Sequence, residues 1–394
     1  MRLDSTIFSL LYSLLLLFAI SVSSLQELGP SLPPSDAIPP DALGTSRIAP
    51  ALFVFGDSSV DSGNNNYLFT LAHADMLPYG RDFDTHTPTG RFCNGRIPVD
   101  YIGEFSHCFS NLASDLRDSM TRLFREFEDG SVESMMQGVN FASAGAGVLF
   151  LSGSDLGQHI SLLQQTQQAK DTFQQFMLSM GEEAANDMIS KSVFYLSIGN
   201  NDYIHYYLRN ASRVQSLFQP WEFSQLLATN IKQELKNLYN ANVRKVVIMG
   251  LAPLGCTPHY LWEYNSKGGL CVSEINDMVI AFNFAMREMV DELHRELPDA
   301  KITFCDVFEG AMDILQNCQH YGFETITDAC CGLGQYGGLI MCISPEMACA
   351  NASKHVWWDQ FHPTGAVNAI IADSVWSGLH ANICYPMNLQ DMVP

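Results

Sequence analysis

Short apolar runs rich in β-branched and aromatic residues recur along the chain, and most end in loops of glycine and small polar residues. Runs of this kind predict strands that are buried on both faces of a parallel sheet. The expected strands lie near residues 51–55, 138–141, 193–198, 244–249 and 301–307. The first strand leads into Gly56-Asp-Ser-Ser, which puts Ser58 just beyond its carboxyl end.

Between these runs, apolar residues recur at helical spacing. The helices predicted from this spacing cover residues 158–180, 221–241, 272–297, 311–315 and 364–379, and a further helix begins near Pro98. An amphipathic helix is also expected between Phe105 and Ser134, where apolar residues face one way and charged residues the other. Strands that alternate with helices predict a parallel sheet covered on both faces. We therefore expect an α/β fold with one three-layer α/β/α domain over residues 51–394.

The first 24 residues have the pattern of a signal peptide. Arg2 supplies a positive charge, residues 7–20 form a short apolar core, and Val22-Ser-Ser24 is a small-residue cleavage site. The alternative is a membrane anchor, but the apolar run is shorter than a spanning helix needs. Residues 25–50 are rich in proline, serine and aspartate, so they are expected to form a flexible lead-in. No transmembrane segment is expected after them.

The composition of the chain limits the kinds of partner that it is expected to bind. The 394 residues are 47% hydrophobic, which is enough for a large core. The formal net charge of -21 repels phosphate backbones and anionic lipid, so no nucleic acid partner is expected. The sequons Asn210-Ala-Ser212 and Asn351-Ala-Ser353 predict N-glycosylation if the chain is secreted.

The cysteines also favour an oxidising compartment. The chain has 11 of them, and several cluster after residue 329. The cluster comprises Cys330, Cys331, Cys342 and Cys349. We interpret these as disulfide-bonded, because no paired Cys or Cys/His spacing supports the alternative of a zinc site. Cys256 and Cys271 flank a loop with proline and glycine that a disulfide between them would close. The odd count leaves at least one thiol unpaired or intermolecular.

Several polar segments are predicted to meet at one edge of the sheet. Ser58, Gly145 and Asn201 each lie in the loop after a predicted strand, and the carboxyl ends of parallel strands share one edge. A fourth segment, Asp359-Gln-Phe-His362, precedes the last helix. Pro363 disfavours helical geometry at His362 and keeps it in the preceding turn. Each segment alone is more typical of an ordinary turn, but their combination and order favour an active site.

These residue types suit nucleophilic catalysis. A serine hydroxyl is a weak nucleophile unless a base removes its proton, and His362 is the candidate base for Ser58. Asp359 is placed to fix the histidine tautomer and to stabilise the imidazolium. The backbone N–H groups of Ser58 and Gly145 and the side-chain amide of Asn201 would suit an oxyanion hole. Each such donor contributes about 3–4 kcal/mol.

Four motifs carry a resemblance to a known family. They are Gly56-Asp-Ser-Ser-Val-Asp-Ser-Gly-Asn-Asn, Gly138-Val-Asn-Phe-Ala-Ser, Gly199-Asn-Asn-Asp and Asp359-Gln-Phe-His-Pro-Thr. In this order the chain resembles the plant-type GDSL lipase/esterases of the SGNH hydrolase superfamily, from about residue 51 to residue 394. The resemblance implies a flavodoxin-like fold with a five-stranded parallel sheet, and a secreted hydrolase of acyl esters that needs no metal or cofactor.

The resemblance also implies roles. Ser58 is the expected nucleophile, Asp359 and His362 complete the triad, and Gly145 and Asn201 complete the oxyanion hole with the Ser58 amide. Asp57 and Asp61 are expected to shape the loop after the first strand. The chain departs from the family at Ser59, where the name motif has leucine, and at Ala144, where many members have glycine. It departs most between residues 105 and 130, where the charged amphipathic stretch replaces the family's usual run and is expected to pack poorly.

The expected function is that of a secreted serine esterase or lipase acting on small-molecule, lipid or cell-wall esters. One alternative is acyl transfer from the same covalent intermediate to an alcohol, because the triad does not determine the acceptor. The other is a secreted glycoprotein on the same scaffold that no longer turns over. The sequence does not specify the acyl chain or the alcohol.

Overall fold

The computed structural model describes residues 49–105, 132–209 and 213–393. The predicted signal peptide, nearly all of the lead-in, most of the expected amphipathic helix and the sequon at Asn210 fall outside these ranges. The described residues belong to one compact unit, residues 46–394, built around a five-stranded sheet of order β1-β2-β3-β4-β5. The strands are β1 (Leu52–Gly56), β2 (Val193–Ser197), β3 (Lys245–Met249), β4 (Lys301–Cys305) and β5 (Cys384–Tyr385).

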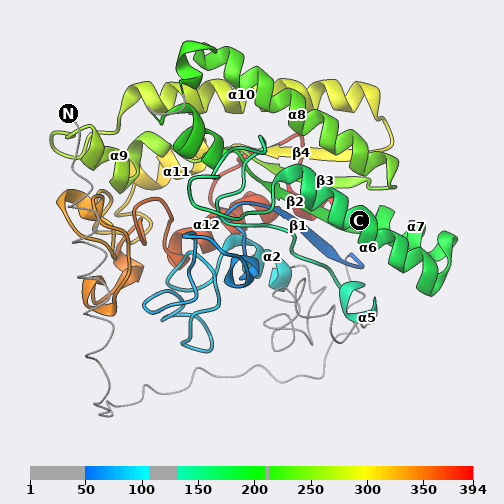
Figure 1. Ribbon diagram of the computed structural model, residues 1–394, viewed down its shortest axis with the longest axis horizontal. Helices are drawn as coiled ribbons and strands as arrows, with labels where there is room; N and C mark the ends of the chain where they lie inside the picture. The colour runs from blue at the N-terminus through cyan, green and yellow to red at the C-terminus, as the bar shows by residue number, and fades with distance from the viewer. Residues whose placement is uncertain (1–48, 106–131, 210–212, 394) are drawn as a thin grey trace. The chain divides into compact units, whose positions relative to one another are not determined.

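The first four strands are parallel and lie in continuous register (Figure 1). Phe53 lies opposite Phe194, which in turn lies opposite Val246. The fifth strand is antiparallel and pairs Cys384 with Cys305. A disulfide joins the same two residues. The α/β class is therefore confirmed, but the sheet is four parallel strands with one short antiparallel edge.

The segment predicted as the second strand does not form a full strand. It lies beside β1 and makes one bridge, between Val54 and Asn140. The N–H of Val54 donates to Val139 O at 2.9 Å, but the side chain of Asn140 turns back and donates to Val60 O at 2.7 Å. β1 therefore has a neighbour on each side: this segment on one side and β2 on the other. From β1 the chain first adds this segment on one side and then β2 on the other, so the direction in which the sheet grows reverses at β1. Open α/β sheets bind their ligands at the carboxyl ends of the strands at such a reversal.

Helices cover both faces of the sheet. Helix α8 (Pro220–Asn240) packs on α10 (Ser273–Glu296), and α12 (Gly365–Ser377) packs on α2 (Pro98–Phe105). Figure 1 shows these two pairs on opposite sides of the strands. The remaining α-helices are α5 (Val132–Met135), α6 (Leu162–Met180), α7 (Glu182–Lys191), α9 (Pro258–Glu263), α11 (Val307–Gln316) and α13 (Leu389–Met392).

Alternate residues of the strands enter two separate cores. Phe53 and Phe194 belong to the core under α6, α8 and α10, and their rings stack at 5.0 Å. Val54 and Tyr195 belong to the core on the face of α2 and α12. Side chains of a strand point alternately to opposite faces, so both faces must be apolar in a covered sheet. This is why each parallel strand is a continuous apolar run.

Disulfides link the loops. The pairs are Cys256–Cys271, Cys305–Cys384, Cys330–Cys349 and Cys331–Cys342. The predicted loop-closing pair is confirmed, and the cluster after residue 329 forms two disulfides, which takes its thiolates away from zinc. Within the described ranges Cys93 and Cys318 are free thiols. None of the described helices combines the length and apolarity that a membrane span requires.

Candidate active site

The end of β1 fixes the position of Ser58. Gly56 has φ +156°, and a Cβ at this position would lie 2.2 Å from Ser197 O, so only glycine fits. The peptide groups of Gly56 are held by the buried amide of Gln165, which donates to Gly56 O and accepts from Gly56 N, both at 2.8 Å. Ser58 follows two residues later and is half-buried. The strand end is therefore locked, and the serine is presented at the sheet edge.

The structure brings Ser58, His362 and Asp359 together, although 304 positions separate Ser58 from His362. Oγ of Ser58 lies 2.8 Å from Nε2 of His362. Nδ1 of His362 lies 2.9 Å from both carboxylate oxygens of Asp359. The turn before α12 also directs the backbone N–H groups of Phe361 and His362 onto Oδ1 of Asp359, at 2.9 and 2.8 Å. One ring nitrogen thus faces the hydroxyl and the other faces the carboxylate.

Burial and pairing act against each other on this histidine and aspartate. Burial raises the pKa of Asp359, but the charge and hydrogen bond of His362 outweigh it and hold that pKa below its ordinary value. Burial lowers the pKa of His362, and Asp359 outweighs this effect, so the pKa of the imidazole lies above its ordinary 6.5. The pair is therefore tuned toward a positively charged imidazolium beside a carboxylate.

Gly145 and Asn201 line the same cavity as Ser58 and His362. The backbone of Gly145 has φ +82°, a conformation that favours glycine. The side-chain amide of Asn201 donates one hydrogen to Ala146 O at 2.9 Å, which leaves its second N–H for another acceptor. Within the described ranges, the backbone N–H groups of Ser58 and Gly145 donate to no protein acceptor. Three hydrogen-bond donors, two backbone amides and one side-chain amide, therefore lie at the mouth of this cavity.

Buried carboxylates hold the donor loops in place. Asp202 accepts from Val148 N at 2.8 Å, from Leu149 N at 2.9 Å and from Ser152 Oγ at 2.6 Å. Asp61 accepts from Ala144 N at 2.9 Å and so joins the loop after β1 to the loop that carries Gly145. Burial raises the pKa of each of these two carboxyls to about 6. The loop-shaping role expected for Asp61 fits these contacts.

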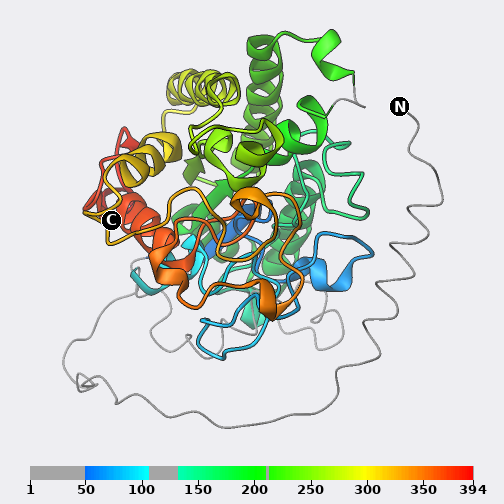
Figure 2. The same ribbon diagram turned by 90° about the vertical axis from the view of Figure 1, so that its left-hand side faces the viewer.

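The cavity at this edge has a volume of about 510 Å³. Its walls combine the polar groups above with apolar side chains from five separate segments. These include Leu71, Met76, Leu156, Ile204, Met341, Ile343 and Phe361. In Figure 2 the orange segment that carries Asp359 and His362 crosses the carboxyl ends of the strands, near the blue loop after β1. A cavity with a few convergent polar groups in an apolar wall is typical of a small-molecule site.

Two residues at the site were not predicted from the sequence. The hydroxyl of Tyr79, which is 4% exposed, donates to Oδ2 of Asp359 at 2.8 Å. The ring of Phe92 lies 5.1 Å from the ring of His362. Both come from the irregular stretch between β1 and α2, whose lack of periodicity gave no signal for either residue.

Other predicted sites differ in their setting. Asn351 is exposed, and its Oδ1 accepts from Ser353 N at 3.0 Å and Ser353 Oγ at 2.7 Å. Within the described ranges, no group of three or more His, Cys, Asp or Glu side chains is arranged to hold a metal ion.

Comparison with known proteins agrees with the geometry. The family model of the GDSL-like lipases/acylhydrolases matches residues 52–375, a range that includes all the site residues above. A GDSL esterase/lipase of Arabidopsis thaliana is 39% identical over 356 residues, 89% of either chain. A second from the same plant is 36% identical over 363 residues, 91% of this chain and 90% of its own. The Arabidopsis GDSL esterase/lipase 7 is 36% identical over 350 residues, 88% of this chain and 92% of its own.

Proposed function

This chain belongs to the GDSL-like lipase/acylhydrolase family, and we propose that it hydrolyses carboxylic esters through an acyl-enzyme formed on Ser58. One observation carries the mechanism: Ser58 Oγ lies 2.8 Å from His362 Nε2 at the mouth of a cavity, while Asp359 binds the other ring nitrogen. A serine, a histidine and a carboxylate in this order form the triad of a serine hydrolase.

In the first half of the reaction, His362 Nε2 takes the proton of Ser58 as Oγ attacks the ester carbonyl. The tetrahedral oxyanion receives hydrogen bonds from the amides of Ser58 and Gly145 and from the side chain of Asn201. The intermediate collapses when His362 returns the proton to the departing alkoxide. The alcohol leaves, and the acyl group remains as an ester of Ser58.

In the second half, His362 removes a proton from water, and the hydroxide attacks the acyl carbonyl. The Ser58 oxygen leaves with the proton held by His362, and the carboxylic acid is released. Asp359 keeps Nδ1 protonated and stabilises the imidazolium in both halves. An alcohol in place of water would give acyl transfer, so analysis of the products with and without an added alcohol separates hydrolysis from transfer.

Labelling with a fluorophosphonate tests this proposal. The probe phosphonylates a serine only when that serine is activated, so wild type should label and Ser58→Ala should not. Ser59→Ala is the matched control, because the hydroxyl of Ser59 is the next one along the chain and is hydrogen-bonded to Ser197 Oγ, at 2.8 Å, rather than to His362. Folded wild type that does not label, or Ser58→Ala that still labels, would reject the mechanism. A series of esters of increasing acyl length then defines the substrate.

We also propose that the protein is secreted and carries N-linked glycans at Asn210 and Asn351. Four disulfides and the signal-like N-terminus support export. At Asn351, the exposed side chain uses its oxygen within the sequon and leaves its amide nitrogen open for the glycan. Expression with and without residues 1–24, followed by peptide N-glycosidase and mass spectrometry, tests both points. Wild type retained inside the cell, or free of glycan outside it, would refute them.

A further inference from the structure

Three stretches of sequence without acidic or basic residues contribute to the mouth of the cavity. Residues 62–74, 138–154 and 329–345 contain no Asp, Glu, Lys or Arg, although the whole chain has 42 acidic and 21 basic residues. Each of the three stretches contributes lining residues to the cavity: Leu71, Gly145 and Met341 are examples. Beside these stretches, Asp75 precedes the lining residue Met76, and Asp155 precedes the lining residue Leu156 and is paired with Arg209 at 2.6 Å. The border of the candidate active site is therefore mostly, though not wholly, uncharged in a strongly acidic protein.

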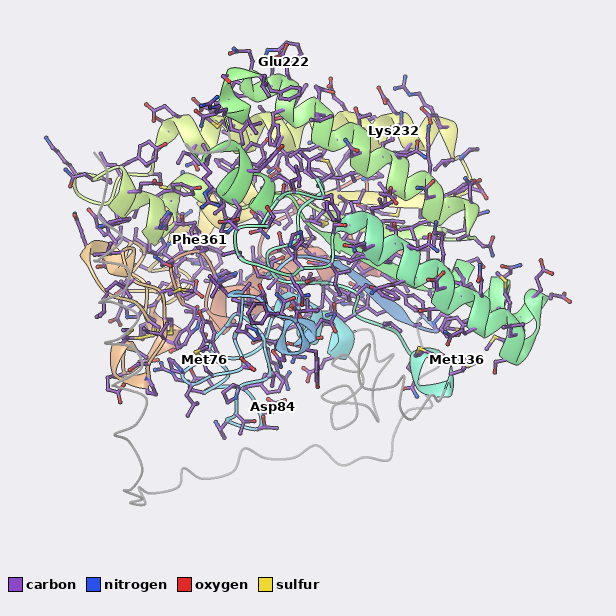
Figure 3. All side chains as sticks on the ribbon, viewed as in Figure 1. Met76, Asp84, Met136, Glu222, Lys232 and Phe361 are labelled. Atoms are coloured by element: carbon purple, nitrogen blue, oxygen red, sulfur yellow. A yellow bond between two sulfur atoms is a disulfide. The ribbon has the colours of Figure 1, made fainter. Side chains whose placement is uncertain are left out.

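Large apolar side chains are exposed along this border. Leu71 is 70% exposed, Met341 is 50% exposed, and Met76 and Ile343 are each 41% exposed, and all four line the cavity. They come from two segments more than 260 positions apart in the sequence. Figure 3 shows Met76 on the same side of the view as Phe361, another lining residue. Single exposed apolar residues are common on protein surfaces, but a gathering of them around one opening is not.

A third segment extends the border outward. Gln158 N donates to Phe69 O at 2.9 Å, and Leu71 N donates to Leu156 O at 2.6 Å, so the loop of residues 150–158 runs beside residues 69–71. Phe69 is 89% exposed and Phe150 is 63% exposed. Neither side chain lines the cavity, so substrate binding inside it does not require them. We call the six residues Phe69, Leu71, Met76, Phe150, Met341 and Ile343 the apolar rim.

We propose that the apolar rim docks the protein onto the surface of an aggregated, uncharged ester substrate, so that the cavity opens directly into the apolar phase. This inference rests on the proposed esterase function and names the physical state of its substrate. The rim is continuous with the cavity that holds Ser58, so a surface seated on it would deliver ester groups to the serine. The net charge of -21 and the lack of Lys and Arg in the three stretches exclude an attraction to anionic surfaces.

Binding can be measured without turnover. Ser58→Ala protein is mixed with droplets of triolein coated with phosphatidylcholine, and the bound fraction is collected by flotation. We expect it to float with the droplets, and we expect a Phe69→Ser/Phe150→Ser change in the same background to lower the partition coefficient at least tenfold. Droplets coated with phosphatidylserine should bind less protein than the zwitterionic droplets.

Leu178→Ser is the matched control. Leu178 is 88% exposed on α6 and does not line the cavity. The Leu178→Ser variant therefore loses an equally accessible apolar side chain at a site away from the rim. Its partition should equal that of the parent. An equal loss for Leu178→Ser, or no flotation of the parent, would overturn the proposal. Concentration-dependent dimers that only the rim variant abolishes, together with unchanged flotation, would assign the rim to a second copy of this chain instead.

Activity separates this proposal from the function on which it rests. The Phe69→Ser/Phe150→Ser change is also made in the active enzyme, which keeps Ser58. On a dissolved short-chain ester this rim variant should retain the wild-type kcat/KM. On emulsified ester its rate should fall by the same factor as its binding to the droplets. A rim variant that loses both rates equally would overturn docking but leave the esterase function intact. No rate on any ester would reject the esterase function, and the flotation result would still report on the rim by itself.

Discussion

Replacing Tyr79 by phenylalanine removes one hydroxyl from the candidate site and keeps the ring. That hydroxyl donates to Oδ2 of Asp359 at 2.8 Å, and Tyr79 is 4% exposed, so water has little access to replace the bond. Its ring packs edge-on against Phe92 and Trp358, contacts that phenylalanine preserves. The substitution therefore isolates the effect of a single donor on the carboxylate.

The magnitude follows from the partners that Asp359 keeps. A hydrogen bond to a charged acceptor contributes about 1.5–3 kcal/mol. The backbone N–H groups of Phe361 and His362 and the imidazole still bind the carboxylate, so it stays in place. With one donor fewer, its negative charge acts more strongly on the imidazole, so the pKa of His362 rises further above its ordinary value. On the acidic side, kcat/KM should then fall about three- to tenfold, with little change at alkaline pH.

The assay is kcat/KM on a dissolved ester measured across about pH 5 to 9, where the acidic limb reports the free enzyme's essential base. Tyr207→Phe is the matched control, because Tyr207 is 2% exposed and donates to Phe218 O at 3.0 Å, away from the triad. It should lose stability, by about 1 kcal/mol, and keep the wild-type profile. If the Tyr79→Phe profile also superimposes on wild type, the hydroxyl only stabilises the fold and the reasoning is wrong.

Further predictions follow from the same contacts. Asp359→Asn should lower kcat by a factor on the order of 10⁴, because the histidine loses the partner that fixes its tautomer; steady-state kinetics of the folded variant measures this. In wild type, activity should fall as pH drops through a midpoint above 6.5, since Asp359 raises the pKa of His362 and the base must be neutral; the pH–rate profile checks it. Gly147→Ala should reduce kcat at least tenfold, because its Cβ would lie 2.4 Å from Ser152 Cβ and 2.8 Å from both carboxylate oxygens of Asp202; kinetics and circular dichroism distinguish a displaced loop from an unfolded chain. Asp61 and Asp202 have pKa values raised from 3.8 to about 6, so the folded state binds more protons than the unfolded state between about pH 4 and 6. The contribution of these two carboxyls to the free energy of unfolding should therefore increase as pH falls through this range. The gain in urea midpoint from pH 7 to pH 5.5 should shrink in Asp202→Asn.

The sheet could be predicted where burial on both faces imposed a continuous apolar run. This holds for β1 to β4, but not for β5, which has two residues and is set by the Cys305–Cys384 pair. The run near residue 139 has the same pattern as a strand, yet the side chain of Asn140 accepts from Ala142 N and donates to Val60 O, 80 positions earlier in the chain. The long helices began and ended within a few residues of prediction, whereas α7 was missed. It follows α6 after a single glycine, so the pattern shows no separate boundary.

The residues of the candidate site also fall into two groups, those that the sequence pattern predicts and those that it does not. Residues in loops after strands could be predicted, because parallel strands place their carboxyl ends together whatever the rest of the fold does. Tyr79 could not, since its position depends on an irregular loop held by long-range contacts such as Arg81 Nη1 to Cys349 O at 2.7 Å. A local pattern carries no information about a partner 280 positions away, which is the separation of Tyr79 from Asp359.

Four buried aspartates surround the site, and their pKa values identify the one that takes part in the proposed chemistry. Burial raises the pKa of Asp57, Asp61 and Asp202, because the hydrogen bonds that each receives do not offset the loss of water. Asp359 is equally removed from water, yet its pKa is lowered, because it alone of the four shares a hydrogen bond with a histidine. The first three carboxylates hold loops through neutral donors and have no charged partner in contact. A carboxylate that is kept ionised by an imidazole can in turn stabilise the imidazolium when the imidazole accepts the serine proton, and only the position of Asp359 permits that exchange.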